Sequence, residues 1–488
     1  MKFTEVLSFI HDMVLGWRGK GNPDVRDIEI HSSKVKEGDL FICRKGERFD
    51  SHRVAKEVVK KGAVALICEY DVGNLGVPMA IVSDSRVTEA VLADVFYGSP
   101  YKKLLTFGVT GTNGKTTVTH MIHHVLSKMK MKGSLIGTVK NYIVGEIEKT
   151  ENTTPSALYL FRKMKETVDK KGEYFVLEVS SHALVQSRVF SIRFDSVGLT
   201  NITRDHLDFH KSFEDYMKSK FTIFNLLKSD GVGVINSEFI SHFKSRRFRK
   251  VFFGKIGDYV VWDISVSSKE TIFRLDTPYG RKKVELKVIG DFNAYNATAA
   301  IAMLAEIGFD IDEVIESLKD FKGVDGRFEF IKEAEKAGNR VIVDFAHSPD
   351  ALDKAIRNAR KFTLENGRVI VVFGAGGRAD KGKRKMMGEI ADRLADIIIV
   401  TNDDPRGEDP HEIIEDILEG FSKHKPLVIE DRREAIETAM TLASRRDVVL
   451  IAGRGHEEYQ VFNDDMKVPF KDAEVVREIA REKLKKKR

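Results

Sequence analysis

Short apolar runs alternate with amphipathic stretches between about residue 101 and residue 332. Continuous apolar and β-branched runs predict strands buried on both faces, and apolar positions recurring every three or four residues predict helices. Strands are predicted at 105–109, 174–179, 196–200 and 232–236, and helices at 116–130, 156–170 and 213–228. Buried strands between helices are typical of a mostly parallel sheet with helices on both sides.

A second alternating series begins near residue 333. Strands are predicted at 340–345, 368–373, 396–401, 427–430 and 448–452, and helices near 350–362, 384–395, 410–422 and 431–445. This order predicts a Rossmann-like domain. Gly374-Ala-Gly-Gly377 does not complete the dinucleotide fingerprint, because position 379 is Ala and a charged loop follows. We therefore reject a nicotinamide cofactor.

The first hundred residues form a third region with predicted strands at 39–43, 63–68 and 79–82, closing at Gly98-Ser-Pro100. A chain of 488 residues is long enough for three domains. We predict an α/β protein with a mixed N-terminal domain at 1–100, a central, mostly parallel domain at 101–332 and a Rossmann-like C-terminal domain at 333–488.

Composition excludes several classes of protein. The net charge of +6 arises from 80 basic and 74 acidic residues, a balance that does not indicate nucleic-acid binding. Two cysteines, Cys43 and Cys68, are too few for a disulfide framework and fit a reducing compartment. Apolar runs are too short for a membrane helix or a secretory signal. We expect a cytoplasmic protein without stable membrane association.

The segment Gly108-Val-Thr-Gly-Thr-Asn-Gly-Lys-Thr-Thr117 carries the strongest chemical signal. A predicted strand enters a glycine-rich turn and a predicted helix leaves it, an arrangement that binds phosphate through backbone N–H groups. Lys115 is expected to contact the outer phosphates, and Thr116 to bind Mg²⁺. The strict Walker spacing is not met, because position 109 is Val. Nucleoside triphosphate binding is favoured over an ordinary strand–turn–helix corner.

Candidate metal ligands follow two other predicted strands. Glu178 closes the strand at 174–179, and Asp205 and His206 follow the strand at 196–200. Ligands of parallel sheets bind beyond the carboxyl ends of the strands, so Glu178 is expected to face the loop that carries Lys115. The neighbouring Ser and His after Glu178 do not indicate a hydrolase, because G-x-S-x-G is absent. The alternative for Asp205 and His206 is a polar loop.

Six motifs occur in an order that resembles the Mur ligase family, the ATP-dependent amide-bond-forming enzymes of peptidoglycan precursor synthesis. The resemblance covers nearly the whole chain. The motifs are Gly111-Thr-Asn-Gly-Lys-Thr-Thr117, Glu178-Val-Ser-Ser-His-Ala-Leu-Val-Gln186, Asn201 to His206, Asn293-Ala-Tyr-Asn296, Gly326-Arg-Phe-Glu329 and Asp344-Phe-Ala-His-Ser-Pro-Asp350.

Within the family the chain most resembles members that add the third residue of the peptide. The resemblance implies that ATP phosphorylates the D-Glu carboxylate of UDP-N-acetylmuramoyl-L-alanyl-D-glutamate, and that the amine of a free diamino acid then displaces phosphate. It implies ATP and Mg²⁺ as cofactors and carbamylation of Lys220, whereas sequence position alone predicts an exposed helix lysine. We expect a monomer.

The resemblance assigns roles to individual residues. Those implied in catalysis are Lys115, Glu178, His206 and Lys220, and those implied at the metal are Thr116, Glu178, His206 and carbamylated Lys220. ATP is expected at Gly111, Thr112, Asn113, Gly114, Lys115, Thr116, Thr117, Asn293, Asn296, Arg327 and Asp344. The UDP substrate is expected at Ile30, Ser32, Glu47, Asn152, Thr153, Thr154, Ser180, Gln186 and Arg188. The amino acid is expected at Arg378, Asp403, Asp404, Pro405, Arg406, Gly453 and Glu457.

The choice of amino acid rests on Asp403-Asp404-Pro405-Arg406. Members that add meso-diaminopimelate typically carry Asp-Asn-Pro-Arg, so Asp404 adds a negative charge where the family has a neutral amide. That charge attracts an ammonium and repels a distal carboxylate, by about 1–3 kcal/mol if partly desolvated. The sequence therefore favours lysine, with meso-diaminopimelate as the alternative.

Two rival functions are weighed. One is a folylpolyglutamate synthetase-like ligase, which the Asp-Asp-Pro-Arg406 motif and Gly453-Arg-Gly-His-Glu457 disfavour. The other is a P-loop nucleotide switch, which would bind nucleotide without amino-acid-dependent turnover. His206 and Lys220 argue against a switch.

Overall fold

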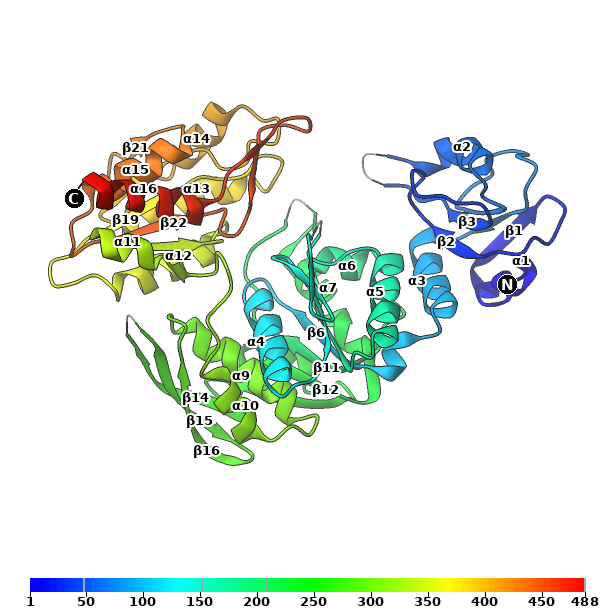
Figure 1. Cartoon of the computed structure of the whole chain (residues 1–488), viewed down its shortest axis with the longest axis horizontal. Helices are drawn as coiled ribbons and strands as arrows, with labels where there is room; N and C mark the ends of the chain where they lie inside the picture. Colours follow the sequence, from blue (N-terminus) through cyan, green and yellow to red (C-terminus); the bar gives the residue numbers. More distant parts are fainter. Residues whose placement is uncertain (47–48, 151, 208, 268, 487–488) are drawn as a thin grey trace. The chain divides into compact units, whose positions relative to one another are not determined.

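The computed structural model describes residues 1–46, 49–150, 152–207, 209–267 and 269–486 (Figure 1). The chain divides into two compact units. The first comprises 1–110, 126–198 and 219–233, and the second comprises 111–125, 199–218 and 234–488. Four elements have residues in both units: α4 (Lys115–Lys128), β11 (Phe194–Leu199), α7 (Phe213–Phe221) and β12 (Leu227–Asn236). Within the described ranges, no helix combines the length and the apolar character needed to cross a bilayer.

The N-terminal part of the first unit is a five-stranded sheet in the order β1-β5-β4-β3-β2. The edge strand β1 runs antiparallel to β5, and the other pairs are parallel. Asp84 caps α3 by accepting hydrogen bonds from the first helical N–H groups, as N-cap residues do. The strands are β1 (Val14–Arg18), β2 (Asp27–Glu29), β3 (Asp39–Ile42), β4 (Ala65–Cys68) and β5 (Met79–Val82), and the helices are α1 (Phe3–Ser8), α2 (Ala55–Lys60) and α3 (Ser85–Phe96).

The first unit also holds a larger sheet in the order β11-β6-β10-β7-β8-β9. Parallel pairing of β10 with β6 and with β7 leaves these three strands pointing the same way. The strands are β6 (Leu105–Thr110), β7 (Gly133–Ile136), β8 (Asn141–Ile143), β9 (Glu146–Glu148), β10 (Tyr174–Glu178) and β11 (Phe194–Leu199), and the helices are α5 (Ala157–Asp169) and α6 (Ser181–Val185). The buried strands β6 and β10 therefore end at one edge, where ligands of such sheets bind.

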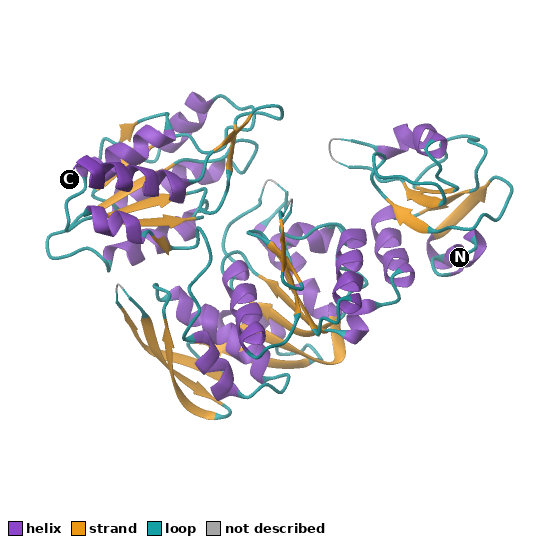
Figure 2. Ribbon diagram, in the orientation of Figure 1, coloured by secondary structure: helices purple, strands orange, loops and turns teal. Residues whose placement is uncertain are grey.

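The strands β13 to β16 of the second unit are neighbours in the order β16-β15-β14-β13. The pairs β14–β15 and β15–β16 are antiparallel, and α9 packs against β13, β14 and β15 (Figure 2). The elements are α8 (Ile240–Phe243), β13 (Arg249–Gly254), β14 (Tyr259–Val266), β15 (Thr271–Thr277), β16 (Gly280–Leu286), α9 (Phe292–Ala305) and α10 (Ile311–Leu318).

The C-terminal part of the second unit is a six-stranded sheet in the order β17-β18-β22-β19-β20-β21. One apolar core joins it to α12, α13 and α14, and a second joins it to α11, α15 and α16, so helices cover both faces. The strands are β17 (Glu329–Phe330), β18 (Arg340–Asp344), β19 (Val369–Phe373), β20 (Ile397–Val400), β21 (Leu427–Val428), β22 (Val448–Ala452), β23 (Tyr459–Val461) and β24 (Lys467–Pro469). The helices are α11 (Lys332–Ala337), α12 (Pro349–Arg360), α13 (Gly382–Leu394), α14 (Pro410–Leu418), α15 (Arg432–Leu442) and α16 (Asp472–Lys486).

The structure confirms the α/β class and the predicted strands. It also differs from the prediction in several places. The helix predicted at 213–228 ends at Phe221, because a 3-10 turn (Thr222–Leu226) follows and β12 begins at Leu227. The short strands β1, β2, β7, β8, β9, β17, β23 and β24 were not predicted. The strands β13 to β16, between 249 and 286, were not predicted either, and the pairs β14–β15 and β15–β16 are antiparallel. They give the central region a substantial antiparallel part.

Candidate functional site

The glycine-rich turn after β6 is held in a shape that requires glycine at two positions. Gly111 and Gly114 have φ values of +148° and +89°. A Cβ on Gly111 would lie 1.9 Å from Thr200 Oγ1, and one on Gly114 would lie 2.5 Å from Asn296 Oδ1. Both glycines therefore allow close approach of neighbouring polar side chains.

Residues that follow β11 fix this loop. The N–H of Asn113 donates to Asn201 Oδ1 (2.9 Å), and Thr200 Oγ1 donates to the Asn113 carbonyl (2.6 Å). Lys115 Nζ donates to the carbonyls of Gly111 and Thr112, both at 2.9 Å. The ammonium thus lies over the loop at the N-terminus of α4, where negative phosphate oxygens are favoured.

Asp350, in the first turn of α12, also contacts this loop. Its Oδ2 atom accepts hydrogen bonds from Asn113 Nδ2 (3.1 Å) and Thr203 Oγ1 (3.3 Å). The same atom forms an ion pair with Lys354 Nζ at 2.8 Å. One carboxylate oxygen therefore joins the phosphate-type loop to a helix of the C-terminal sheet.

A cavity of about 100 Å³ in the second unit brings together six of the predicted nucleotide residues. Phe345 lines the same cavity, and the Arg327 guanidinium lies 4.3 Å from the centre of its ring. Aromatic and guanidinium planes offer stacking surfaces to a base. The predicted residues that line it are Asn113, Gly114, Thr117, Asn296, Arg327 and Asp344, and the others are Asn201, Phe292, Phe328, Phe345, Ala346, Ala351, Lys354 and Ala355.

Asn293 does not line this cavity, although the resemblance placed it at ATP. Its Nδ2 donates to the Ile289 carbonyl (3.0 Å), and its Oδ1 accepts a hydrogen bond from Asn296 Nδ2 (3.2 Å). Asn293 therefore orients Asn296. Asp344 accepts a hydrogen bond from the Phe328 N–H (2.6 Å), and desolvation raises the pKa of its carboxyl to about 6 despite nearby Arg327.

Glu178 is buried at the end of β10, in register with Val109 of β6. Its Oε1 accepts a hydrogen bond from the Thr138 N–H (2.8 Å), and its Oε2 accepts one from Thr138 Oγ1 (2.9 Å). Lys220, also in the first unit, is 1% exposed. It is not the exposed helix lysine that sequence position alone predicts.

His206 lies in the second unit with a φ of +54°, and its Nε2 is 3.6 Å from Asp205 Oδ2. His347 Nε2 lies 3.9 Å from the same oxygen. Burial by itself would raise the pKa of Asp205, but His347, His206 and Lys383 lower it to about 2.

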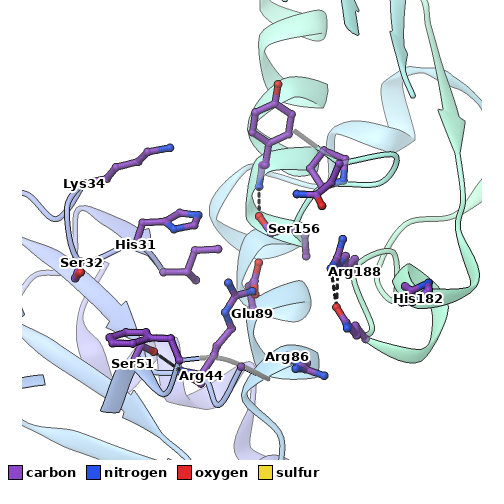
Figure 3. A pocket seen from close by; sticks show the side chains of 18 of the residues that line it. His31, Ser32, Lys34, Arg44, Ser51, Arg86, Glu89, Ser156, His182 and Arg188 are labelled. Carbon is purple, nitrogen blue, oxygen red and sulfur yellow. Dashed lines mark hydrogen bonds and ion pairs between the residues drawn. The ribbon is translucent and has the colours of Figure 1, made fainter. Parts of the chain in front are cut away.

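A larger cavity, about 870 Å³, lies in the first unit between the N-terminal sheet and the region of α5 and α6 (Figure 3). It gathers Ile30, Ser32, Asn152, Gln186 and Arg188 from the residues predicted for the UDP substrate. Figure 3 shows the labelled His31, Ser32 and Lys34 on one side and His182 and Arg188 on the other.

Basic side chains dominate the charge of this cavity. They are Lys34, Arg44, Lys45, Arg86, Lys149 and Arg188, against the acidic Glu89 and Glu148. The sequence analysis missed all of these basic residues except Arg188. Arg44 and Lys45 follow the predicted strand 39–43, so their place at the carboxyl end of a parallel strand was a usable signal. Excess positive charge suits a diphosphate.

Three predicted substrate residues do not line the cavity, and a fourth lies outside the described residues. Thr154 Oγ1 donates to the Glu178 carbonyl (2.7 Å) and accepts a hydrogen bond from the Ser180 N–H (3.0 Å). Thr153 Oγ1 lies 3.1 Å from Thr138 Oγ1. These residues therefore form hydrogen bonds next to the cavity without lining it. The remaining residue is Glu47.

The predicted amino-acid residues centre on an acidic cluster of Asp403, Asp404 and Glu457, whose carboxylates lie within 4.8 Å of one another. A Cβ on Gly453 would lie 2.3 Å from Asp403 Oδ2, so this glycine lets the aspartate approach the turn after β22. Burial and the two aspartates raise the pKa of Glu457 to about 8. The raised pKa means that Glu457 is largely protonated at neutral pH, which reduces the negative charge that the cluster offers to a ligand ammonium.

Arg454, which sequence analysis passed over, is fully buried and changes the role of Asp404. Its Nη1 forms an ion pair with Asp404 Oδ1, and Arg406 Nη2 lies 3.3 Å from Asp404 Oδ2. Asp404 Oδ1 also accepts a hydrogen bond from the Val461 N–H (3.0 Å). The charge of Asp404 is therefore already compensated, which removes the physical basis of the expected preference for lysine.

Pro405 and Arg378 lie at neighbouring loops. A Cβ on Gly377 would come within 1.8 Å of the Pro405 carbonyl oxygen, so the two loops are in close contact. Arg378 has a φ of +50° and forms an ion pair with Asp464 at 3.1 Å. This ion pair connects Arg378 to the loop between β23 and β24.

Comparison with known proteins supplies the wider context. Family models match residues 24–97 as "Mur ligase family, catalytic domain", 109–304 as "Mur ligase middle domain" and 326–455 as "Mur ligase, glutamate ligase domain". Proteins from Clostridium botulinum and Aquifex aeolicus named UDP-N-acetylmuramoyl-L-alanyl-D-glutamate–2,6-diaminopimelate ligase are 39% and 41% identical. The alignments cover 94% and 93% of this chain, and 96% and 93% of those relatives.

A solved structure of a protein with the same name has a TM-score of 0.64 at 29% identity. The match covers 94% of this chain and 95% of that one. The alignments with the relatives and the matches to the three family models both extend over most of this chain. The chain belongs to the Mur ligase family.

Proposed function

We propose that this chain is an ATP-dependent, ADP-forming ligase that joins a diamino acid to the D-Glu carboxylate of UDP-N-acetylmuramoyl-L-alanyl-D-glutamate. The observation that carries this proposal is the 39–41% identity to enzymes of that name over more than nine-tenths of the chain. The three candidate sites, for phosphate, for an anionic substrate and for an amine, match the three substrates of this reaction. The reaction class also accounts for all six sequence motifs.

The proposed chemistry needs positioning and charge compensation more than covalent help from the protein. The D-Glu carboxylate attacks the γ-phosphorus and ADP leaves, giving an acyl phosphate. The amine then attacks the acyl carbon, and phosphate departs with formation of the amide bond. Lys115 and the N-terminus of α4 offset the negative charge that gathers on the γ-phosphoryl oxygens.

Mg²⁺ is part of the proposal, because the chain offers suitable oxygen donors. The Thr116 hydroxyl and the buried Glu178 carboxylate are oxygen ligands of the kind that Mg²⁺ prefers. A carbamate on the buried Lys220 would supply an anionic oxygen ligand, and His206 completes the proposed set. Bound Mg²⁺ would neutralise phosphate charge.

The cavity of about 870 Å³ is proposed to hold the UDP-muramoyl substrate. Arg188 donates to the Thr154 carbonyl (2.6 Å) and to Gln186 Oε1 (2.6 and 3.1 Å), so its guanidinium is fixed at the wall. We propose that it binds the acidic part of the substrate. We also propose a monomeric cytoplasmic enzyme with domains at 1–100, 101–332 and 333–488.

Replacing Arg188 should weaken substrate binding. In Arg188→Ala we expect the KM for the UDP-muramoyl dipeptide to rise about 10- to 100-fold, because a charge-assisted contact is lost, with a smaller change in the KM for ATP. Initial rates of phosphate release measure both constants. Arg193→Ala is the matched control, since Arg193 does not line the cavity. Equal KM values for Arg188→Ala and wild type would contradict this role.

For the amino acid, we propose diaminopimelate in preference to lysine. The relatives are named diaminopimelate ligases, and the Arg454 ion pair compensates the charge on which the lysine argument depended. Arg406 remains 45% exposed in its side chain and can accept a carboxylate. Lysine stays the second candidate, because the acidic cluster binds the ammonium that both amino acids carry.

Competition between the two amino acids tests this choice and the reaction together. The purified enzyme is given ATP, Mg²⁺, the UDP-muramoyl dipeptide and either meso-diaminopimelate or lysine. We expect a higher kcat/KM with diaminopimelate and little phosphate release when the dipeptide is omitted. A higher kcat/KM with lysine would reverse the preference. ATP hydrolysis indifferent to the dipeptide would favour a nucleotide switch, and turnover of folates with glutamate would favour the folylpolyglutamate synthetase-like alternative.

A further inference from the structure

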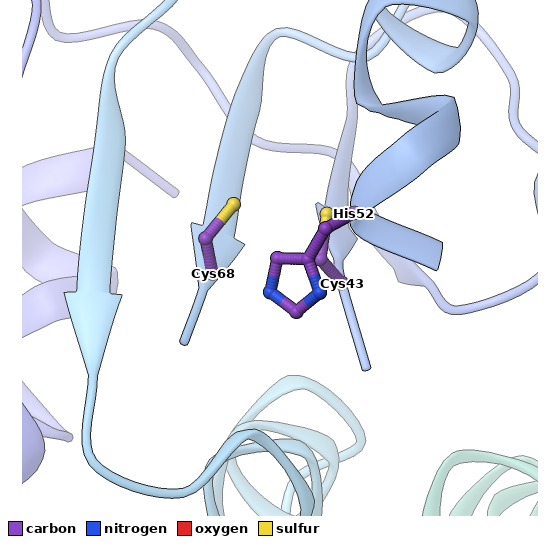
Figure 4. A group of neighbouring side chains, drawn as sticks. All are labelled: Cys43, His52 and Cys68. Carbon is purple, nitrogen blue, oxygen red and sulfur yellow. The ribbon is translucent and has the colours of Figure 1, made fainter. Parts of the chain in front are cut away.

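Cys43, His52 and Cys68 form a cluster in the N-terminal part of the chain, and none of the three is assigned to the ligase reaction (Figure 4). Parallel pairing of β3 and β4 places Ile42 opposite Ile67, so the next residues along each strand, Cys43 and Cys68, are also neighbours. His52 belongs to the 3-10 turn Ser51–Val54. One ligand atom from each residue lies within 4.8 Å of the others.

The surroundings of the cluster suit thiolate–metal bonding. Both cysteines are 0% exposed, and they belong to an apolar core with Phe41, Leu66 and Met79. A cation bound by two thiolates leaves little net charge, which favours it in an apolar environment. Soft sulfur donors select Zn²⁺ and Cu⁺ over hard cations such as Mg²⁺.

A carboxylate contacts one ring nitrogen of His52, as is common for a metal-binding imidazole. Its Nδ1 lies 2.6 Å from Asp50 Oδ1, and Tyr70 donates to the other Asp50 oxygen at 2.7 Å. The Tyr70 ring stacks on the imidazole with centroids 4.2 Å apart. A carboxylate on one ring nitrogen fixes the tautomer and leaves the lone pair on the other. In this structure Nε2 accepts the Glu69 N–H at 2.9 Å, so a metal at Nε2 replaces that hydrogen bond.

We propose that Cys43, His52 and Cys68 bind a thiophilic d¹⁰ cation, Zn²⁺ or Cu⁺. Each thiol gives its proton to solvent and forms one sulfur–metal bond, and no oxidation or reduction occurs. Three protein donors are fewer than the four of a closed structural zinc site, so the ion is bound less tightly than in such sites. The segment from Cys43 to His52 carries Arg44, Lys45 and Ser51 of the large cavity, so the ion fixes both ends of that segment.

Metal titration of the reduced full-length protein tests the proposal independently of ligase activity. One arm adds Zn²⁺, with Co²⁺ as its spectroscopic substitute, and the other adds Cu⁺ under anaerobic conditions. We expect one equivalent bound in at least one arm, a thiolate-to-cobalt charge-transfer band in the Zn²⁺ arm if that arm binds, and a raised Tm. The arm that binds identifies the ion. Failure of both ions to bind stoichiometrically would overturn the proposal.

Three variants assign the ligands. Cys68→Val keeps an apolar side chain of similar size, since buried cysteine behaves as a small hydrophobe, and should bind at least about 100-fold more weakly. His52→Gln should bind about 10-fold or more weakly. His11→Gln is the matched control, an exposed histidine of the same region, and should bind as wild type. Circular dichroism checks that each variant is folded. Unchanged affinity in Cys68→Val or in His52→Gln would overturn the assignment.

Discussion

Lys115→Ala should lower kcat/KM for ligation by about 10³-fold, the upper range for loss of one preorganised charge-stabilising donor. Lys115 lies at the start of α4 and folds over the carbonyls of Gly111 and Thr112. Removing it takes away the positive charge closest to that loop while leaving the backbone unchanged. Phosphate release with all three substrates present measures the loss, and circular dichroism verifies the fold.

Lys128→Ala serves as the control, because Lys128 is an exposed lysine in the last turn of the same helix. It should retain wild-type kcat/KM within about twofold, since a charge remote from the reaction contributes little in screened solvent. Comparable losses in both variants would show that helix stability, and not the position of the ammonium, causes the effect.

Arg432→Met should reduce the free energy of unfolding of the C-terminal region by about 3–5 kcal/mol, the usual cost of breaking a buried ion pair. Arg432 and Asp472 are both fully buried and form two contacts of 2.8 Å. Arg432 also donates to the carbonyls of Ala452 (3.0 Å) and Asn402 (3.3 Å). The variant leaves the Asp472 carboxylate enclosed without its cation.

The adjacent Arg433 offers a matched comparison. Arg433 pairs with Glu478 at 2.7 Å, but both side chains are about half exposed. Arg433→Met should therefore cost at most about 1 kcal/mol. Urea unfolding followed by circular dichroism measures both variants. Equal losses for Arg432→Met and Arg433→Met would mean that burial does not decide the strength of these pairs in this protein.

The parallel sheets were predictable because their strands are continuous apolar segments. Val369–Phe373 and Val448–Ala452 are buried at every position, and such runs between amphipathic helices have few alternative interpretations. The strands β13 to β16, between 249 and 286, lacked that signal. In Tyr259–Val266 buried and exposed positions mix, and a register irregularity interrupts the pairing with β15. Their partner positions depend on contacts that a single sequence does not display.

The candidate sites, like the fold, could be predicted only in part. The phosphate-type loop could be found because its residues are contiguous, from Gly111 to Thr117. Arg44 and Arg86 line the large cavity through folding of distant segments, so their common location was not visible in the sequence. Asp404 was identified by position, but the ion pair that compensates its charge is made by Arg454, which lies fifty residues later. Whether a charged side chain has a partner of opposite charge depends on the tertiary structure.

The hydrogen bonds of Asp350 imply a linkage between substrates. Asn113 of the phosphate-type loop and Lys354 of α12 share one carboxylate oxygen, so a ligand that reorients Asn113 changes the charge balance at the start of α12. Any such influence of nucleotide on amino-acid affinity must be matched by an equal influence of amino acid on nucleotide affinity, because binding free energies are coupled reciprocally. The size of that mutual effect on affinity then depends on this single contact as well as on the pockets.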